Sequence, residues 1–248
     1  MMLILVAHKM SVSKLIFAGA AFLMLTATGC IDDFFICGNG VPGSETRQTP
    51  SFSSVSSEGN FSVYISPGET YEVLLQAETN LLPYIETEVR RKNLRIFVHG
   101  MNNLRNRLPM EVYITVPFIE NVVQSGSGSI NTEHFDGDDF KFVISGSGSI
   151  ETSVDAISVN AIISGSGNLY IAGVAWDADM VISGSGEIDA WDLSLHYCEA
   201  MISGSGDIWV DVDRWLKATI SGSGNIYYRG TPEVESVVSG SGRIIRKN

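Results

Sequence analysis

The chain has 248 residues, of which 44% are hydrophobic and 18% are charged, so it is too apolar for an intrinsically disordered protein. Its 28 acidic and 16 basic residues give a net charge of −12, which excludes nucleic acid as a favoured partner because phosphate binding needs clustered lysine and arginine. The length permits one or two domains, and the positions of the 25 glycines decide between fold classes.

Residues 1–29 have the pattern of a lipoprotein signal peptide. Lys9 and Lys14 supply a positive region, and the apolar run that follows is too short to cross a bilayer, which takes about 20 apolar residues. Small residues then precede Cys30, which resembles the lipobox of bacterial lipoproteins. The resemblance implies a lipidated Cys30 anchored in the outer membrane of a Gram-negative envelope. An ordinary secretory signal remains the alternative.

Residues 30–51 are expected to hold the lipidated cysteine and a tether, of which 38–51 have the composition of a mobile segment. Two aspartates after Cys30 resemble a surface-export signal or serve as a solvated spacer, so periplasmic and surface orientations both stay open. Cys37 and Cys198 either form a disulfide or remain two free thiols. The chain has no Cys-x-x-Cys motif, so a redox or zinc site of that type is unsupported.

Residues 52–124 are predicted to be rich in β-structure. They should either form irregular first coils or cap the regular part that follows. A short helical turn is expected between residues 80 and 86. Alternating apolar residues bounded by turn signals predict strands over 61–65, 71–75, 94–98 and 112–116.

Residues 125–248 are organised by a repeat. The tetrapeptide Ser-Gly-Ser-Gly begins at Ser125, Ser145, Ser164, Ser183, Ser203, Ser221 and Ser239. An aliphatic residue lies two positions after every copy, and an aliphatic residue also precedes each copy except the first. Each unit therefore predicts a strand, a tight corner and a second strand, with the aliphatic side chains facing inward.

A unit of about 19 residues cannot bury its apolar face alone, but stacked copies can, so the repeat predicts an all-β parallel solenoid. Glycines suit a corner that lies directly on the next corner, because they lack Cβ and adopt positive φ. A propeller blade needs about 40 residues, and two glycines in every unit argue against a helical repeat.

The Ser-Gly-Ser-Gly-x-Ile repeat, together with Asn80-Leu81-Leu82, Leu94-Arg95-Ile96 and Ile114-Thr115-Val116-Pro117, resembles the autotransporter adhesin head, or GIN-domain, family. The resemblance covers residues 52–245. It implies a single-stranded, right-handed β-helix similar in shape to pectin lyases but without their catalytic residues, and a role in cell adhesion.

Motifs for catalysis and metal binding are largely missing. The sequence contains no His-Glu-x-x-His motif and no nucleophile elbow, and seven identical Ser-Gly-Ser-Gly copies indicate a structural role for their serines. Paired aspartates leave a polysaccharide-active enzyme open, because a glycosidase needs two carboxyl groups in a cleft. No cofactor or metal is expected, apart from weak, incidental Ca²⁺ at an acidic loop over residues 135–139.

Three aromatic residues stand out as candidate ligand contacts. Tyr170, Trp209 and Tyr227 each lie three positions after a corner, where strand alternation places the side chain outside. They either bind a glycan or a surface protein, or merely cover the sheet. The sequence thus predicts a non-enzymatic, lipid-anchored envelope protein for binding or adhesion. The alternatives are a polysaccharide-active enzyme on the same fold and a purely structural envelope protein.

Overall fold

The computed structural model describes residues 35–100 and 102–247. The chain divides into two compact units, residues 1–35 and residues 36–248, and the second contains the solenoid. The signal peptide expected over 1–29 and the lipidated Cys30 lie outside the described residues. In the part of the chain that is described, no helix is long and apolar enough to cross a membrane.

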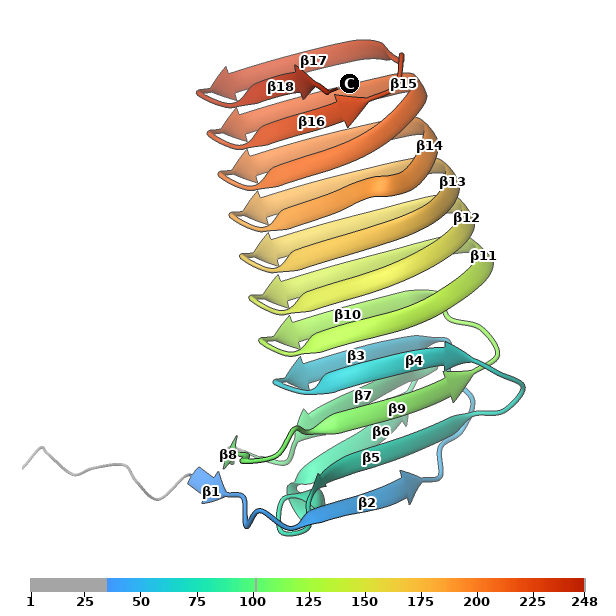
Figure 1. Ribbon diagram of the computed structural model, residues 1–248, viewed down its shortest axis with the longest axis vertical. Helices are drawn as coiled ribbons and strands as arrows, with labels where there is room; N and C mark the ends of the chain where they lie inside the picture. The colour runs from blue at the N-terminus through green and yellow to red at the C-terminus, as the bar shows by residue number, and fades with distance from the viewer. Residues whose placement is uncertain (1–34, 101, 248) are drawn as a thin grey trace, which may run out of the picture. The chain divides into compact units, whose positions relative to one another are not determined.

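Long strands that each wind once around the core make up the regular part of the solenoid (Figure 1). Each strand pairs in parallel with the next, which confirms the predicted all-β parallel solenoid. Each has 16–18 residues and is joined to the next by a two-residue corner, so the repeat of about 19 residues is also confirmed. These strands are β11 (Ser129–Gly146), β12 (Ser149–Gly165), β13 (Asn168–Gly184), β14 (Glu187–Gly204) and β15 (Asp207–Gly222).

The corners stack directly on one another through their backbones. Gly165 has a φ of +138°, and a Cβ placed on it would lie 2.4 Å from the carbonyl oxygen of Gly146 in the preceding coil. The backbone N–H of Ser166 donates to that same oxygen at 2.9 Å. A side chain at this position would therefore displace the hydrogen bond that joins the coils.

The aliphatic residues on both sides of each corner form two continuous columns inside the solenoid. Most of their side chains are fully buried, and burying each one contributes roughly 1.5–3 kcal/mol. The first column begins with Gln124, which is also buried and donates from Nε2 to the carbonyl of Gly59 at 3.3 Å. The last coil is the exception: Val238 is 45% exposed and Ile244 is only half-buried.

Two further coils precede the first Ser-Gly-Ser-Gly corner. β3 and β4 meet at a corner formed by Gly59, Asn60 and Phe61, which lacks the repeat motif. The backbone amides of Ser127 and Ser129 nevertheless donate to the carbonyls of Gly59 and Phe61, as at the regular corners. The strands of these coils pair in parallel with one another and with the regular coils. They are β3 (Ser54–Gly59), β4 (Ser62–Pro67), β7 (Asn93–Val98), β9 (Glu111–Val116) and β10 (Asn121–Gly126).

Antiparallel pairing closes the solenoid at the end that precedes these coils. β2 pairs with β5, β5 with β9, and β6 with β7, so residues 52–124 supply both first coils and a cap. The expected helical turn is a single 3₁₀ turn, η1. The capping elements are β2 (Pro42–Arg47), β5 (Glu72–Glu78), η1 (Leu82–Tyr84) and β6 (Ile85–Arg90).

At the opposite end, no described strand covers the last coil (Figure 1). β16 and β17 pair with β15, and β18 pairs with β16. A separate two-stranded sheet is formed by β1 and β8. The remaining bounds are β1 (Phe35–Cys37), β8 (Asn103–Arg105), β16 (Asn225–Arg229), β17 (Glu233–Gly240) and β18 (Arg243–Arg246).

The mobile tether expected over 38–51 is wrong for its middle part, because β2 is a paired strand of the cap. The segment before it is held by the buried carboxylate of Glu78. This group accepts hydrogen bonds from the backbone amides of Gly40 at 2.6 Å and Arg107 at 2.8 Å. Burial raises the pKa of Glu78, but the backbone N–H donors outweigh it and keep the pKa below its usual value.

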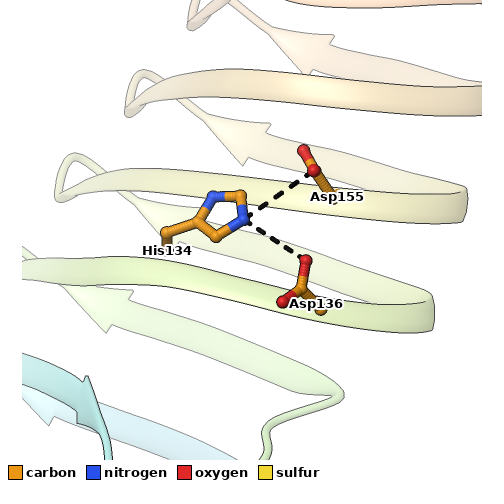
Figure 2. Close-up of side chains that lie close together, drawn as sticks. All are labelled: His134, Asp136 and Asp155. Atoms are coloured by element: carbon orange, nitrogen blue, oxygen red, sulfur yellow. Dashed lines mark ion pairs between the residues drawn. The ribbon is translucent and has the colours of Figure 1, made fainter.

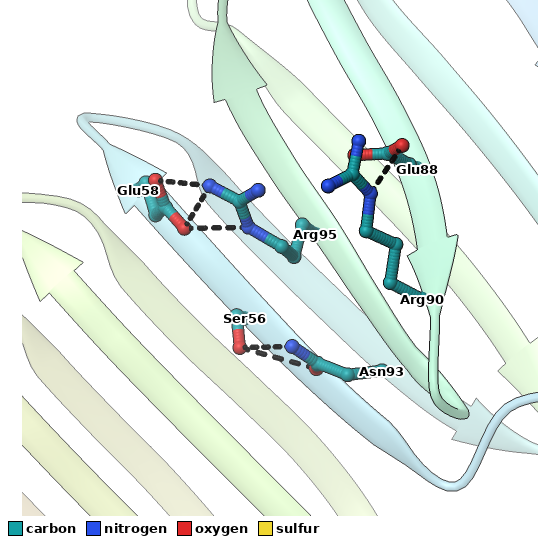
Figure 3. Close-up of polar contacts among 6 residues, drawn as sticks. All are labelled: Ser56, Glu58, Glu88, Arg90, Asn93 and Arg95. Atoms are coloured by element: carbon teal, nitrogen blue, oxygen red, sulfur yellow. Dashed lines mark hydrogen bonds and ion pairs between the residues drawn. The ribbon is translucent and has the colours of Figure 1, made fainter.

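Polar side-chain pairs join β3 and β7, the strands next to the cap (Figure 3). Arg95 on β7 reaches Glu58 on β3 through two hydrogen bonds of 3.0 and 3.1 Å, and Asn93 and Ser56 pair in the same way. In each pair the two residues are offset by two positions in the parallel register, so their side chains meet diagonally across the two strands.

Candidate ligand-binding face

One outward-facing column of side chains runs along the solenoid next to the corners. Its members occupy equivalent positions in successive coils, because the parallel register pairs each one directly with the next. We call it the aromatic column, and it consists of Tyr113, Tyr64, Asn131, Glu151, Tyr170, Asp189, Trp209 and Tyr227.

The three aromatic residues singled out from the sequence all lie in this column. Trp209 and Tyr227 are adjacent, and their rings stack with a centroid distance of 5.1 Å and an interplanar angle of 14°. Lys247 places its Nζ 5.2 Å from the centre of the Tyr227 ring. Tyr170 is 40% exposed and is separated from Trp209 by Asp189. Their role in binding stays a prediction.

Sequence reasoning missed two members of the column, Tyr64 and Tyr113. Their rings stack with a centroid distance of 5.1 Å and an interplanar angle of 18°. They lie in the two successive coils that precede the first regular coil. Tyr64 lies within the strand predicted over 61–65, but its coil has no Ser-Gly-Ser-Gly corner to fix the register. The long-range pairing of β4 with β9 and β11 supplies that register, and a local pattern does not encode it.

A shallow hollow of about 500 Å³ lies beside Tyr170 in the middle of the column. Its lining combines the phenol ring with the carboxylates of Glu151, Asp189 and Asp192. Partial burial, and then the neighbouring carboxylates, raise the pKa of Tyr170, so the phenol remains a hydrogen-bond donor at neutral pH. Burial also raises the pKa of Glu187 in the adjacent column, with Asp189 adding to the effect.

This arrangement suits recognition of a polar ligand with apolar faces. Aromatic rings present flat apolar surfaces, and the interleaved carboxylates and amide provide hydrogen-bond acceptors. Adjacent strands are about 4.8 Å apart, so the column offers contacts at regular intervals along the solenoid axis.

A second exposed apolar feature lies on the curved side of the coils. Ile157, Val174 and Trp176 are exposed and line a hollow of about 490 Å³. His196 packs edge-on against the Trp176 ring at 4.5 Å, and the guanidinium of Arg214 lies 5.6 Å from its centre. None of these residues was singled out from the sequence, and they lie in the middle of the continuous strands β12, β13, β14 and β15.

Carboxylates and an imidazole also converge on the surface of β11 and β12 (Figure 2). His134 Nε2 lies 3.4 Å from an oxygen of Asp136 and 3.9 Å from an oxygen of Asp155. The acidic loop expected over residues 135–139 is wrong, since this segment belongs to strand β11. The sequence missed the cluster because Asp155 comes from the next coil, directly opposite Asp136.

Both cysteines of the described residues are free thiols, which decides between the two alternatives left open by the sequence. Cys37 is exposed, whereas Cys198 is buried inside the solenoid between Ala178 and Leu216. Burial raises the pKa of the Cys198 thiol far above its usual value, so this residue acts as a small apolar core residue.

Solved structures of other bacterial proteins share this fold. A putative adhesin from Bacteroides fragilis superposes with a TM-score of 0.80 and 21% identity, covering 86% of this chain and all of its own. A putative lipid binding protein from Parabacteroides distasonis has a TM-score of 0.74 and 23% identity, with the same coverage. A putative adhesin from Parabacteroides merdae has a TM-score of 0.71 and 22% identity, covering 86% of this chain and 99% of its own.

None of the curated proteins matches the chain. A family model described as "Putative auto-transporter adhesin, head GIN domain" matches residues 51–232. This range runs from the cap to the last regular coils, and it agrees with the resemblance found in the repeat. The chain therefore belongs to the family of auto-transporter adhesin heads with a GIN domain.

Proposed function

We propose that the protein is a non-catalytic envelope protein, tethered through Cys30, that binds a glycan chain along the aromatic column. The observation that carries this proposal is the register. It aligns Tyr64, Tyr170, Trp209 and Tyr227 on one outward face although they are far apart in the sequence. The adhesin family of the chain supports a role at the cell surface or in the envelope.

A glycan fits the chemistry of this face. The apolar face of a sugar ring packs on an aromatic ring, while its hydroxyl groups donate to carboxylates such as Glu151 and Asp189. Because the column runs parallel to the axis, an extended chain of sugars would meet several coils at once. Such repeated weak contacts raise the overall affinity without a deep pocket.

The non-catalytic part of the proposal rests on the structural use of the repeated serines. Their backbone amides join one corner to the next, for example Ser185 to Gly165 and Ser205 to Gly184. The polysaccharide-active enzyme predicted as an alternative would instead need a pair of carboxyl groups that cleave the glycan. Cleavage is therefore measured in the same experiment as binding.

The test is a glycan array probed with residues 36–248, with and without calcium. We expect selective binding that Trp209→Ala weakens at least about tenfold, since central aromatic residues dominate such interfaces. The matched control is Trp176→Ala. Trp176 lies outside the column, is 48% exposed and lines a different hollow with Ile157 and Val174. This control should bind like the unmodified protein.

Three results would contradict the proposal in different ways. If the folded protein binds no glycan on the array, the glycan ligand is excluded, and a protein partner or a structural role is left. If the protein binds a glycan and then shortens it, the alternative of a polysaccharide-active enzyme is favoured. Mass spectrometry of the mature protein that finds an unmodified amino terminus in place of an acylated Cys30 removes the lipid anchor.

A further inference from the structure

We propose that His134, Asp136 and Asp155 form a binding site for a divalent transition-metal ion, with zinc as the best-fitting ion, that clips the β11 coil to the β12 coil. This His–Asp–Asp cluster lies on the surface, as Figure 2 shows. None of its three residues belongs to the aromatic column.

The separation of the donor atoms matches a zinc site. Nε2 of His134 lies 3.4 Å from Oδ1 of Asp136 and 3.9 Å from Oδ2 of Asp155, and the three donor atoms lie within 4.8 Å of one another. Tetrahedral zinc with bonds of about 2.1 Å places its ligands about 3.4 Å apart. Small rotations of the two exposed carboxylates would bring all three donors to that spacing and leave a fourth position for water.

The backbone holds these residues in place. His134 and Asp136 are two positions apart on β11 and therefore share one face of the strand. Asp155 lies directly opposite Asp136 in the parallel register, and Ser153 lies opposite His134. The site is thus built on paired strands, which position side chains more exactly than loops do.

The imidazole ring is already oriented for a metal. His134 Nδ1 and the hydroxyl of Ser153 form a hydrogen bond of 3.0 Å, so Nε2 is the nitrogen that points to the carboxylates. In known metal sites, the ring nitrogen that does not bind the metal is usually held by such a partner. Ser153 is therefore a positioning residue for the proposed ligand.

The donor set also selects the type of ion. Two carboxylates directly opposite each other on neighbouring strands repel, and a divalent cation between them removes that repulsion. Calcium prefers six to eight oxygen ligands, whereas one imidazole and two carboxylates suit zinc. Among the described residues, this is the one group of three such side chains whose donor atoms come so close.

A second histidine provides a natural control. His196 Nδ1 pairs with an oxygen of Asp213 at 2.8 Å on the same solenoid. This pair belongs to no group of three donor residues among the described part of the chain. It should therefore bind zinc far more weakly than the His–Asp–Asp cluster.

The experiment is a calorimetric titration of the chelator-treated full chain with zinc chloride. We expect one strong site per chain, which His134→Asn and Asp155→Asn each abolish and His196→Asn leaves intact. Ser153→Ala should weaken binding roughly tenfold while one ion is still bound, as expected for loss of a positioning contact. Zinc should raise the melting temperature of the unmodified chain but not that of His134→Asn.

These variants should fold, because the side chains of His134, Asp136 and Asp155 are 48%, 84% and 53% exposed. Circular dichroism of each metal-free variant verifies this. The proposal is overturned if the unmodified chain binds no zinc, or if His134→Asn binds as tightly as the unmodified chain. Calcium that binds to the same residues with equal affinity would overturn the assignment to a transition metal.

Discussion

Gly165 shows how a single residue position meets two separate requirements. Its φ of +138° lies where side chains are strained, and the space beside it is filled by the carbonyl of Gly146. The same pair of constraints recurs at Gly146, Gly184 and Gly204. The neighbouring Ser166 has neither constraint, since it is exposed and contributes its backbone amide.

Replacing Gly165 with alanine should therefore destabilise the protein by roughly 2–5 kcal/mol, from backbone strain together with the steric conflict. The melting temperature of the variant should fall by roughly 10 °C in a scanning calorimeter. Ser166→Ala is the matched control and should stay within about 0.5 kcal/mol of the unmodified protein. Equal stability of the two variants would contradict close corner stacking.

At the scale of elements, the cap depends on a buried carboxylate more than on strand propensity. β2 has mostly exposed side chains and lies at the edge of the sheet, where it pairs only with β5. Glu78, at the end of β5, accepts from the amide of Gly40 in the segment that leads into β2. It also accepts from the amide of Arg107 in the segment between β8 and β9. Loss of the Glu78 charge should loosen these two segments together.

Glu78→Gln should lower the melting temperature by roughly a few degrees at pH 7, because hydrogen bonds to a charged acceptor are lost. The pKa of Glu78 is lower in the folded protein than its ordinary value of 4.5. Its stabilisation is therefore complete above that value and is lost as the pH falls through the lower, folded-state pKa.

Thermal unfolding of the unmodified protein and of Glu78→Gln between pH 7 and pH 2 measures the difference in their melting temperatures. This difference should shrink at the acidic end of the range. Glu45→Gln is a suitable control, because Glu45 lies on β2 and forms only an exposed ion pair of 3.1 Å with Arg47. If the difference in melting temperature between the unmodified protein and Glu78→Gln stays constant across the pH range, the charge of Glu78 does not stabilise the cap.

Some of the secondary-structure elements could be predicted from the sequence, and others could not. The strands expected over 61–65, 71–75, 94–98 and 112–116 are confirmed within about three residues at their ends, because alternation is a local signal. The tether was wrong in its middle part because β2 is a polar edge strand whose partner strand, β5, is remote in sequence.

The candidate sites divide in the same way. Trp209 and Tyr227 each lie three residues after a Ser-Gly-Ser-Gly corner, so their alignment could be predicted by counting residues along the sequence. The pairing of Tyr64 with Tyr113 and the meeting of His134 with Asp155 depend on long-range register or on a neighbouring coil. No periodicity in the sequence marks those contacts.

At the scale of the whole molecule, the solenoid is a series of columns in which each coil contacts only its neighbours. The stability of such a fold is approximately a sum over coils and the interfaces between them. Removal of one complete coil should therefore shorten the molecule without changing the arrangement of the others.

Deleting residues 166–184 removes one coil, joins Gly165 to Ser185 and restores an intact corner. The variant should unfold cooperatively and be shorter by about 4.8 Å along the axis, which small-angle X-ray scattering can measure. It should keep the His–Asp–Asp cluster and lose Tyr170. Deleting only 166–175 is the control, since half a coil destroys the register. A full-coil deletion that is as unfolded as this control would refute independent coils.

The two ends of the solenoid differ, since antiparallel strands close one end while no described strand covers β17 and β18 at the other. Every strand of the closed end, through Val116, precedes the first regular coil in the chain. Synthesis from the amino terminus therefore produces those strands first. We expect the completed cap to serve as a template on which each later coil docks in turn, so that the order of synthesis would also be the order of assembly.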